Sequence, residues 1–142
     1  MKVREIMTTK VVRIGHREPA EVAARTLTHY NIGVLPVCGD DGRLCGVVTD
    51  RDLVTRCMAS GKAAGEVKVR DVMTGRVITA APDMDVGEAA ALMGREQVRR
   101  LPVVENGRLC GMVSLADLAG AKKGGWEAAG ALSQITANVC KK

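Results

Sequence analysis

The pentapeptide Gly42-Arg43-Leu44-Cys45-Gly46 occurs twice in this chain, the second time unchanged as Gly107-Arg108-Leu109-Cys110-Gly111. The residues upstream of it are duplicated in the same order. Val3-Arg4-Glu5-Ile6-Met7-Thr8 returns as Val69-Arg70-Asp71-Val72-Met73-Thr74, and Leu35-Pro36-Val37 returns as Leu101-Pro102-Val103. The second copy has one residue fewer in the turn before the pentapeptide. A match of this extent indicates an internal duplication, which decides how the whole chain is organised.

The duplication predicts the domain boundaries. Residues 2–59 form the first copy and residues 68–120 the second. The segment between them, 60–67, begins with small and polar residues, which is typical of a short linker. Residues 121–142 remain as a tail.

Both copies predict the same order of elements, β-α-β-β-α, after an initial helical turn. In the first copy we expect a strand near Val11-Val12, a helix over 20–30, strands over 34–38 and 44–48, and a helix that begins at Asp50. In the second copy we expect them at Val77-Ile78, 86–97, 100–105, 109–113 and from Leu115. Asn106-Gly107 is a strong signal for a two-residue hairpin turn. A single copy would leave its sheet uncovered, so we expect the two copies to pack together.

Composition limits the function classes. The 142 residues carry a formal charge of +5, which favours anionic partners without choosing among them. Tyr30 and Trp126 are the only aromatic residues, so platforms for base stacking are largely excluded. We find no apolar stretch of about 20 residues and no leader-like N-terminus, and we expect a cytoplasmic protein. The five cysteines lack C-x-x-C spacing, which favours reduced, buried thiols over a metal or redox site.

Two equivalent motifs carry the chemistry. Each follows a strand that starts with glycine, and each places a hydroxyl residue three positions before an aspartate: Thr49 and Asp52 in the first copy, Ser114 and Asp117 in the second. The carboxylate could accept both hydroxyls of a ribose, and the hydroxyl residue with the helix start could accept a phosphate. The same spacing is also that of a capping box, which satisfies a helix end without any ligand. Its recurrence in register favours nucleotide binding.

The order of these motifs, V-R-x-h-M-T, then h-L-P-V, then G-R-L-h-G-h-h-[TS]-x-x-D-L, resembles the CBS domain, here present twice. The resemblance covers residues 2 to about 120 and implies an α/β (α+β) fold, in which two domains of β-α-β-β-α order pack by their sheets with pseudo-two-fold symmetry. The tail from Trp126 to Val139 is similar to the C-terminal helix of small stand-alone bacterial proteins of this family.

The resemblance also implies two clefts, each with an acidic motif from one copy and apolar strand residues from the other. Their expected residues are Thr8, Val12, Ile32, Ser114 and Asp117 in one cleft, and Thr49, Asp52, Thr74, Ile78 and Val98 in the other. The basic residues Arg99 and Arg100 stand where some nucleotide-sensing relatives contact phosphate, whereas the first copy has Gly33 and Val34 there. We therefore expect the two clefts to differ. The alternative for the apolar residues is that they only pack in the core. The alternative for the two arginines is that they are solvated and contact no ligand.

The resulting hypothesis is a non-catalytic regulatory module that senses an adenine nucleotide (AMP, ADP or ATP) or S-adenosylmethionine. The resemblance further implies a homodimer built through exposed helices that carry Leu92 and Met93, acting on a regulated protein that the sequence does not identify. No nucleophile with its base, no phosphate-binding Gly-Lys loop and no metal constellation is apparent, and His16 and His29 lack partners at ligand spacing. A basic nucleic-acid-binding module and a purely structural dimerisation module remain the alternatives, although a nucleic-acid partner is disfavoured.

Overall fold

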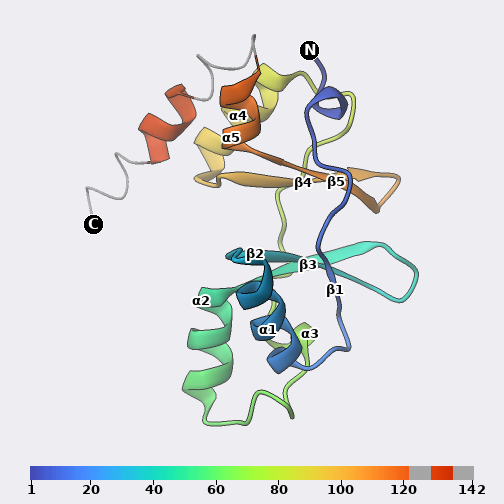
Figure 1. The fold of residues 1–142 in the computed structure, drawn as a ribbon, viewed down its shortest axis with the longest axis vertical. Coiled ribbons are helices and arrows are strands. Elements are labelled where there is room, and N and C mark those ends of the chain that lie inside the picture. The colour runs from blue at the N-terminus through green and yellow to red at the C-terminus, as the bar shows by residue number, and fades with distance from the viewer. Residues whose placement is uncertain (122–128, 136–142) are drawn as a thin grey trace. The chain divides into compact units, whose positions relative to one another are not determined.

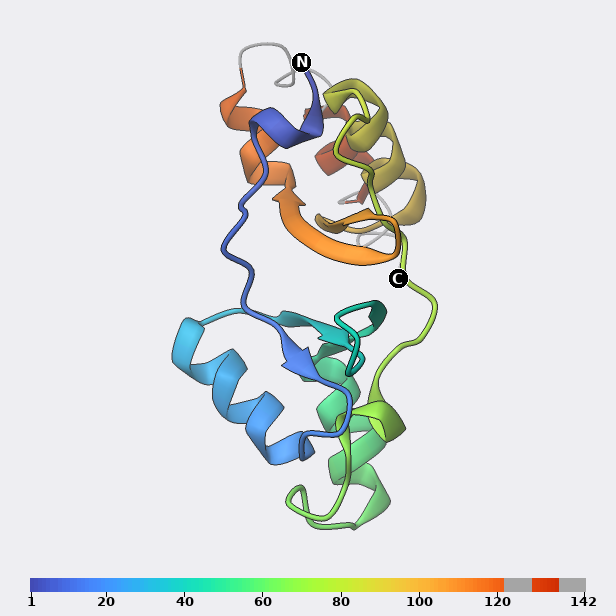
Figure 2. The ribbon, with the colours of Figure 1, turned by 90° about the vertical axis from the view of Figure 1, so that its right-hand side faces the viewer.

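The computed structural model describes residues 1–121 and 129–135, which form two compact units. Unit 1 combines Met1–Val11 and Ile78–Asn106 with the described residues from Cys110 onward. Unit 2 combines Val12–Val77 with Gly107–Leu109. Each repeat therefore begins in one unit and continues in the other, so that the first segments of the two copies are exchanged (Figures 1 and 2). We describe each unit by itself.

The sheet of unit 2 has the strand order β1-β2-β3. Strand β1 (Ile14–Gly15) runs parallel to β2 (Val34–Cys38), and β2 runs antiparallel to β3 (Leu44–Thr49). Strands β4 (Arg100–Glu105) and β5 (Arg108–Ser114) form a two-stranded sheet, which belongs to unit 1 apart from the first two residues of β5. Asn106 and Gly107 connect these two strands with φ of 53° and 79°, the left-handed values that a tight hairpin turn requires. The predicted hairpin is confirmed.

Helices pack against each sheet (Figure 1). In unit 2, α1 (Ala20–Tyr30) is followed after β3 by a continuous helical stretch that starts as α2 (Asp50–Asp52), widens into the π-helical turn η2 (Leu53–Cys57) and ends as the 3₁₀ turn η3 (Met58–Ser60). The exchanged helix α3 (Val69–Val72) completes the unit.

Unit 1 contains α4 (Val86–Glu96), α5 (Leu115–Gly120) and the exchanged 3₁₀ turn η1 (Val3–Glu5). Part of the tail helix expected between Trp126 and Val139 is observed over 129–135, and both named ends lie outside the described residues. In the described part of the chain, no helix combines the length and the apolar character that a membrane crossing would need.

The predicted first strand of each copy is displaced. We expected strands at Val11-Val12 and Val77-Ile78, but β1 begins at Ile14, and the second copy retains only an isolated bridge between Ala80 and Val103. The chain passes from one unit to the other at both predicted positions, so these β-branched residues have no ladder partner there.

The second copy cannot extend its bridge for a further reason. In the first copy the N–H of His16 donates to the carbonyl of Cys38 at 3.0 Å. The equivalent residue of the second copy is Pro82, which has no N–H to donate. The parallel pairing therefore ends after one bridge.

The two units have separate cores of Val, Leu, Ile, Ala and Met, as the lack of aromatic residues implies. The inward face of α4 buries Val86, Ala89, Ala90, Met93 and Gly94, which follow helical spacing. The expectation that Met93 lies on an exposed helix is therefore wrong, since its side chain is fully buried, and Leu92 packs partly against the same core. Gly94 lies against the tail helix, because a Cβ atom there would stand 3.3 Å from the Cα of Ala131.

Gly46 and Gly111 allow the exchanged segments to dock. In unit 2 the backbone of Thr74 pairs with Val47 on β3 through hydrogen bonds of 3.0 and 2.8 Å. In unit 1 Thr8 pairs with Met112 in the same way, at 2.8 and 2.9 Å. A Cβ atom on Gly46 would lie 2.6 Å from the carbonyl oxygen of Thr74, and one on Gly111 would lie 3.0 Å from that of Thr8. At Gly46 a side chain would force the backbone to shift, and at Gly111 it would make an unusually tight contact.

We predict that Gly46→Ala destabilises the protein by about 1–3 kcal/mol, because the new methyl group must displace backbone rather than a flexible side chain. Urea denaturation followed by circular dichroism measures this change. Gly75→Ala is the matched control, since a Cβ atom at Gly75 meets no atom within 4 Å. Equal stability of the two variants would contradict the close-approach argument.

Candidate functional site

The two motifs form the same corner at a strand end. Thr49 ends β3 and caps the following helix, with its Oγ1 accepting from the N–H of Asp52 at 3.0 Å. The carboxylate of Asp52 accepts from the N–H of Thr49 at 3.1 Å. Ser114 and Asp117 repeat this arrangement at 3.1 and 2.8 Å. Both corners are therefore genuine capping boxes, which was the alternative interpretation of the motif.

A neighbouring loop is tied to each corner. The N–H of Leu115, the first residue of α5, donates to the carbonyl of Arg99 at 2.8 Å. In unit 2 the N–H of Asp50 donates to the carbonyl of Gly33 at 3.3 Å. The predicted basic position is thus adjacent to the corner in unit 1, where both Arg99 and Arg100 are exposed. Unit 2 has glycine at that position and an exposed aspartate, Asp50, in place of the buried Leu115.

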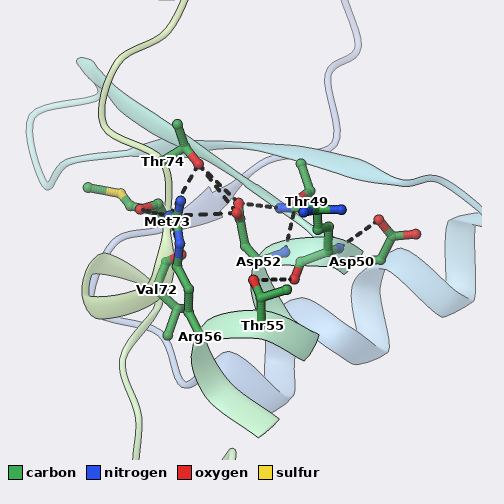
Figure 3. Close-up of polar contacts among 9 residues, drawn as sticks. Thr49, Asp50, Asp52, Thr55, Arg56, Val72, Met73 and Thr74 are labelled. Atoms are coloured by element: carbon green, nitrogen blue, oxygen red, sulfur yellow. Dashed lines mark hydrogen bonds and ion pairs between the residues drawn. The ribbon is translucent and has the colours of Figure 1, made fainter. Parts of the chain in front are cut away.

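The carboxylate of Asp52 is engaged well beyond its capping box (Figure 3). Thr74 on the exchanged segment donates its hydroxyl toward both carboxylate oxygens, at 3.3 and 3.4 Å. The guanidinium of Arg56 forms an ion pair with Asp52, with 3.6 Å between Nη1 and Oδ1. Asp52 retains only 6% of its surface exposed.

The carboxylate of Asp117 is much less engaged. Among the described residues, Ser114 is the only one that hydrogen-bonds to it, through its N–H. Thr8 is the equivalent of Thr74, and it pairs with Met112 through its backbone while its side chain stays exposed. The position equivalent to Arg56 is Ala121, which has no side-chain donor. Within the described residues, the carboxylate in the corner of unit 1 therefore has acceptors that no other side chain engages.

The structure brings together part of each predicted residue set. Thr8, Ser114 and Asp117 lie in unit 1 with Arg99 and Arg100, and Thr49, Asp52 and Thr74 lie in unit 2. The remaining four residues are half-buried and pack against the core of their own unit: Val12, Ile32, Ile78 and Val98. Core packing, the alternative role, is thus observed for them, and their role in ligand binding stays a prediction.

Sequence reasoning missed Arg56 and Asp50. A signal for Arg56 exists, because it stands four residues after Asp52, the spacing at which charged side chains meet on a helix. The same spacing does not reveal that Arg56 also reaches residues 72–74, which come from the other copy.

No group of three or more potential metal ligands occurs in the described ranges, 1–121 and 129–135. His16 lies 3.4 Å from the carboxylate of Asp40, and His29 stacks edge-on against Tyr30. Both histidines therefore have ordinary surface partners.

Comparison with known proteins relates the whole repeat to one family. The family model described as "CBS domain" matches residues 3–59 and 69–124. The CBS domain-containing protein YhcV of Bacillus subtilis is 35% identical over 134 residues, which cover 94% of each chain. Hypoxic response protein 1 of Mycobacterium tuberculosis is 35% identical over 116 residues, covering 82% of this chain and 81% of the relative.

Two solved structures have a similar fold. A crystal structure of Hypoxic Response Protein I with two coordinated zinc ions matches with a TM-score of 0.76 and 34% identity, over 84% of this chain and 97% of that one. The CBS domain pair of protein MJ0100, in complex with 5′-methylthioadenosine and S-adenosyl-L-methionine, matches with a TM-score of 0.71 and 28% identity, again over 84% and 97%.

The equivalent cysteines Cys45 and Cys110 lie on β3 and β5. Burial raises the pKa of the Cys45 thiol above its ordinary value, and the neighbouring Cys38 and Asp41 raise it further. Burial, together with Glu105, likewise raises the pKa of Cys110. Each sulfur donates to a strand carbonyl at 3.3 Å, Cys45 to Val37 and Cys110 to Val103. Both thiols are therefore partly buried, and their raised pKa favours the protonated form, which is the less nucleophilic one.

We predict that Cys45 and Cys110 react with iodoacetamide more slowly in the native protein than in urea, because the thiolate is the reactive form. Mass spectrometry of alkylated peptides at about pH 8 measures both rates in one sample.

The pKa of each thiol is higher in the folded protein than the unfolded value of about 8.5. The stability that the protonated thiols contribute is therefore complete below about pH 8.5 and is lost as pH rises through the folded pKa. Faster native alkylation would contradict this assignment.

Proposed function

The chain belongs to the CBS domain family, and from this premise we propose that it is a non-catalytic regulatory module that binds an adenosine-containing ligand at the corner of unit 1. Ser114 and Asp117 hold the ribose in this proposal. Arg99 and Arg100 contact a phosphate where the ligand has one, and Thr8 supplies a further hydroxyl. AMP, ADP, ATP and S-adenosylmethionine are the candidate ligands.

The availability of the Asp117 carboxylate is the observation that carries this proposal. An ionised carboxylate has about four acceptor positions on its two oxygens. The N–H of Ser114 takes one of them, at Oδ2, and no other described residue bonds to the group. The remaining acceptors suit two adjacent hydroxyls, which is the pattern that a ribose offers.

The ligands of a related structure support the ligand class. The similar CBS domain pair of MJ0100 contains 5′-methylthioadenosine and S-adenosyl-L-methionine, and both molecules have an adenosine half. The basic pair at Arg99 and Arg100 would in addition favour a phosphorylated ligand in this chain.

We predict that Asp117→Ala weakens binding of AMP or S-adenosylmethionine about tenfold or more, because hydrogen bonds to a charged group contribute about 1.5–3 kcal/mol. Isothermal titration calorimetry measures the affinity. Loss of the capping box also lowers stability by about 0.5–2 kcal/mol, which urea denaturation reports separately. Glu88→Ala is the matched control, since it removes an exposed carboxylate from α4 of the same unit.

A purely structural capping box gives a different result. In that case Asp117→Ala lowers stability but leaves the affinity equal to that of Glu88→Ala. This outcome would refute the ribose site and leave only the fold.

We further propose that the protein is a homodimer formed through unit 2. A groove of about 510 Å³ lies between α1 and the helical stretch that follows β3. Apolar side chains line it, among them Leu27, Leu53 and Cys57, and Val54 and Met58 at its edge are 54% and 73% exposed. Exposed apolar patches of this kind mark interaction sites. The dimer surface that was expected at Leu92 and Met93 is not available, because both side chains pack against the core of unit 1. The groove in unit 2 is therefore proposed in its place.

We predict a dimer at micromolar concentration by light scattering, and a monomer for Met58→Glu, because an ionised carboxylate would lose hydration in an apolar interface. Ala91→Glu adds the same charge to an exposed position of α4 and should leave the dimer intact. A monomeric wild-type protein, or dimers in both variants, would contradict this surface.

A further inference from the structure

We propose that Arg56 closes the corner of unit 2 to ribose, so that Asp52 acts as a latch on the exchanged segment and the chain has one open adenosine corner instead of two. The latch comprises Asp52, Arg56 and Thr74. This inference rests on the proposed function for its statement about ligand number, whereas the latch itself stands on contacts within unit 2.

One guanidinium nitrogen of Arg56 contacts three consecutive residues of the exchanged segment, 72–74. Nη1 of Arg56 donates to the carbonyl of Val72 at 3.1 Å and to that of Met73 at 2.9 Å. It also lies 3.3 Å from the hydroxyl of Thr74, which accepts from it (Figure 3). These carbonyls follow α3 at the point where the segment turns toward its bridge with Val47. Arg56 therefore fixes the end of α3 to the π-helical turn η2.

Both carboxylate oxygens of Asp52 already face a donor or a cation of the chain. Oδ2 accepts from the N–H of Thr49 at 3.1 Å and from the Thr74 hydroxyl at 3.3 Å. Oδ1 lies 3.4 Å from the same hydroxyl and 3.6 Å from Nη1 of Arg56. Each oxygen thus faces a donor of the chain itself. Because Asp52 is only 6% exposed, a ribose that reached these oxygens would have to move Thr74, Arg56 or both.

Charge makes that displacement unfavourable. A buried carboxylate is stable when a cation and hydrogen bonds compensate it, and Arg56 supplies the cation. Ribose hydroxyls are neutral, so they could replace the hydrogen bond of Thr74 but not the charge of Arg56. The exposed carboxylate of Asp50 beside this corner also disfavours a phosphate, whereas the corner of unit 1 has Arg99 in that region.

The second copy shows which residue makes the difference. Both copies keep the hydroxyl residue, the aspartate and the threonine of the exchanged segment, but Arg56 corresponds to Ala121. Where the arginine is absent, the threonine is exposed and the aspartate bonds only to its capping partner among the described residues. Arg56 is therefore the positioning residue that separates a closed corner from an open one.

Titration of the full chain with AMP, and separately with S-adenosylmethionine, tests the closure by stoichiometry. We expect one equivalent for the wild type, loss of it in Asp117→Ala, and one equivalent of unchanged affinity in Asp52→Ala. Arg56→Ala introduces the residue that the second repeat has at this position, Ala121, and this variant should bind a second equivalent of ligand. Arg51→Ala is the matched control, since it removes an exposed arginine of the same helical stretch and should keep one equivalent. Two equivalents in the wild type, or only one in Arg56→Ala, would overturn the closure.

Hydrogen exchange tests the latch without any ligand. The N–H groups of Val47 and Thr74 bond across the docked segment, so Arg56→Ala should raise their exchange rates about tenfold or more, with Arg51→Ala unchanged. If Arg56→Ala does not fold, Arg56→Lys takes its place. It keeps the charge and the closed corner but spans the carbonyls poorly, so exchange should still rise. Unchanged exchange overturns the latch. If the wild type binds neither ligand, the proposed function is refuted. Hydrogen exchange alone then decides whether the latch exists.

Discussion

The fold depends on one close approach, that of an exchanged segment to a glycine on the strand before each motif. At Gly46 the backbone of the incoming segment comes so near that a methyl group would overlap its carbonyl oxygen, and at Gly111 a methyl group would make an unusually tight contact with it. This approach allows Thr74 to pair with β3 and Thr8 to pair with β5. It also gives each unit a helical turn from the other repeat. The duplicated sequence therefore yields two units that are interleaved along the chain, and neither repeat contains a complete unit.

The same docking brings a threonine next to each acidic motif, and from that point the two copies differ. In unit 2 a threonine and an arginine face both oxygens of a buried aspartate. In unit 1 the corresponding carboxylate bonds only to its capping partner among the described residues, and two exposed arginines, Arg99 and Arg100, lie at the start of β4 nearby. Duplication thus produced two corners of equal backbone geometry and unequal chemistry. This difference bears on the proposed function, since a symmetric module would present the same site twice.

Local patterns were reliable where a residue's neighbours in sequence are also its neighbours in space. The helix over 20–30, the strands over 34–38 and 100–105 and the turn at Asn106-Gly107 follow from spacing and turn chemistry. Prediction failed where a distant partner decides. Val11-Val12 has strong strand propensity but no strand beside it, and Pro82 stops a pairing that His16 makes in the other copy. Met93 was predicted on an exposed helix, but it follows the helical spacing of Val86, Ala89 and Ala90 and is buried with them in the core of unit 1.

The sequence by itself determined the duplication, the order of elements, the family and both hydroxyl-aspartate motifs, because each of these is written in short segments that repeat in register. Tertiary structure decided which repeat supplies each threonine, whether a carboxylate is engaged and which helix surface stays exposed. The reason is physical. A carboxylate is engaged by whichever donors or cations folding brings near it. For Asp52 these are Arg56, four residues away in sequence with 3.6 Å between the charged atoms, and Thr74, more than twenty residues away with a hydroxyl at 3.3 Å. The contact with Thr74 exists only once the chain has folded.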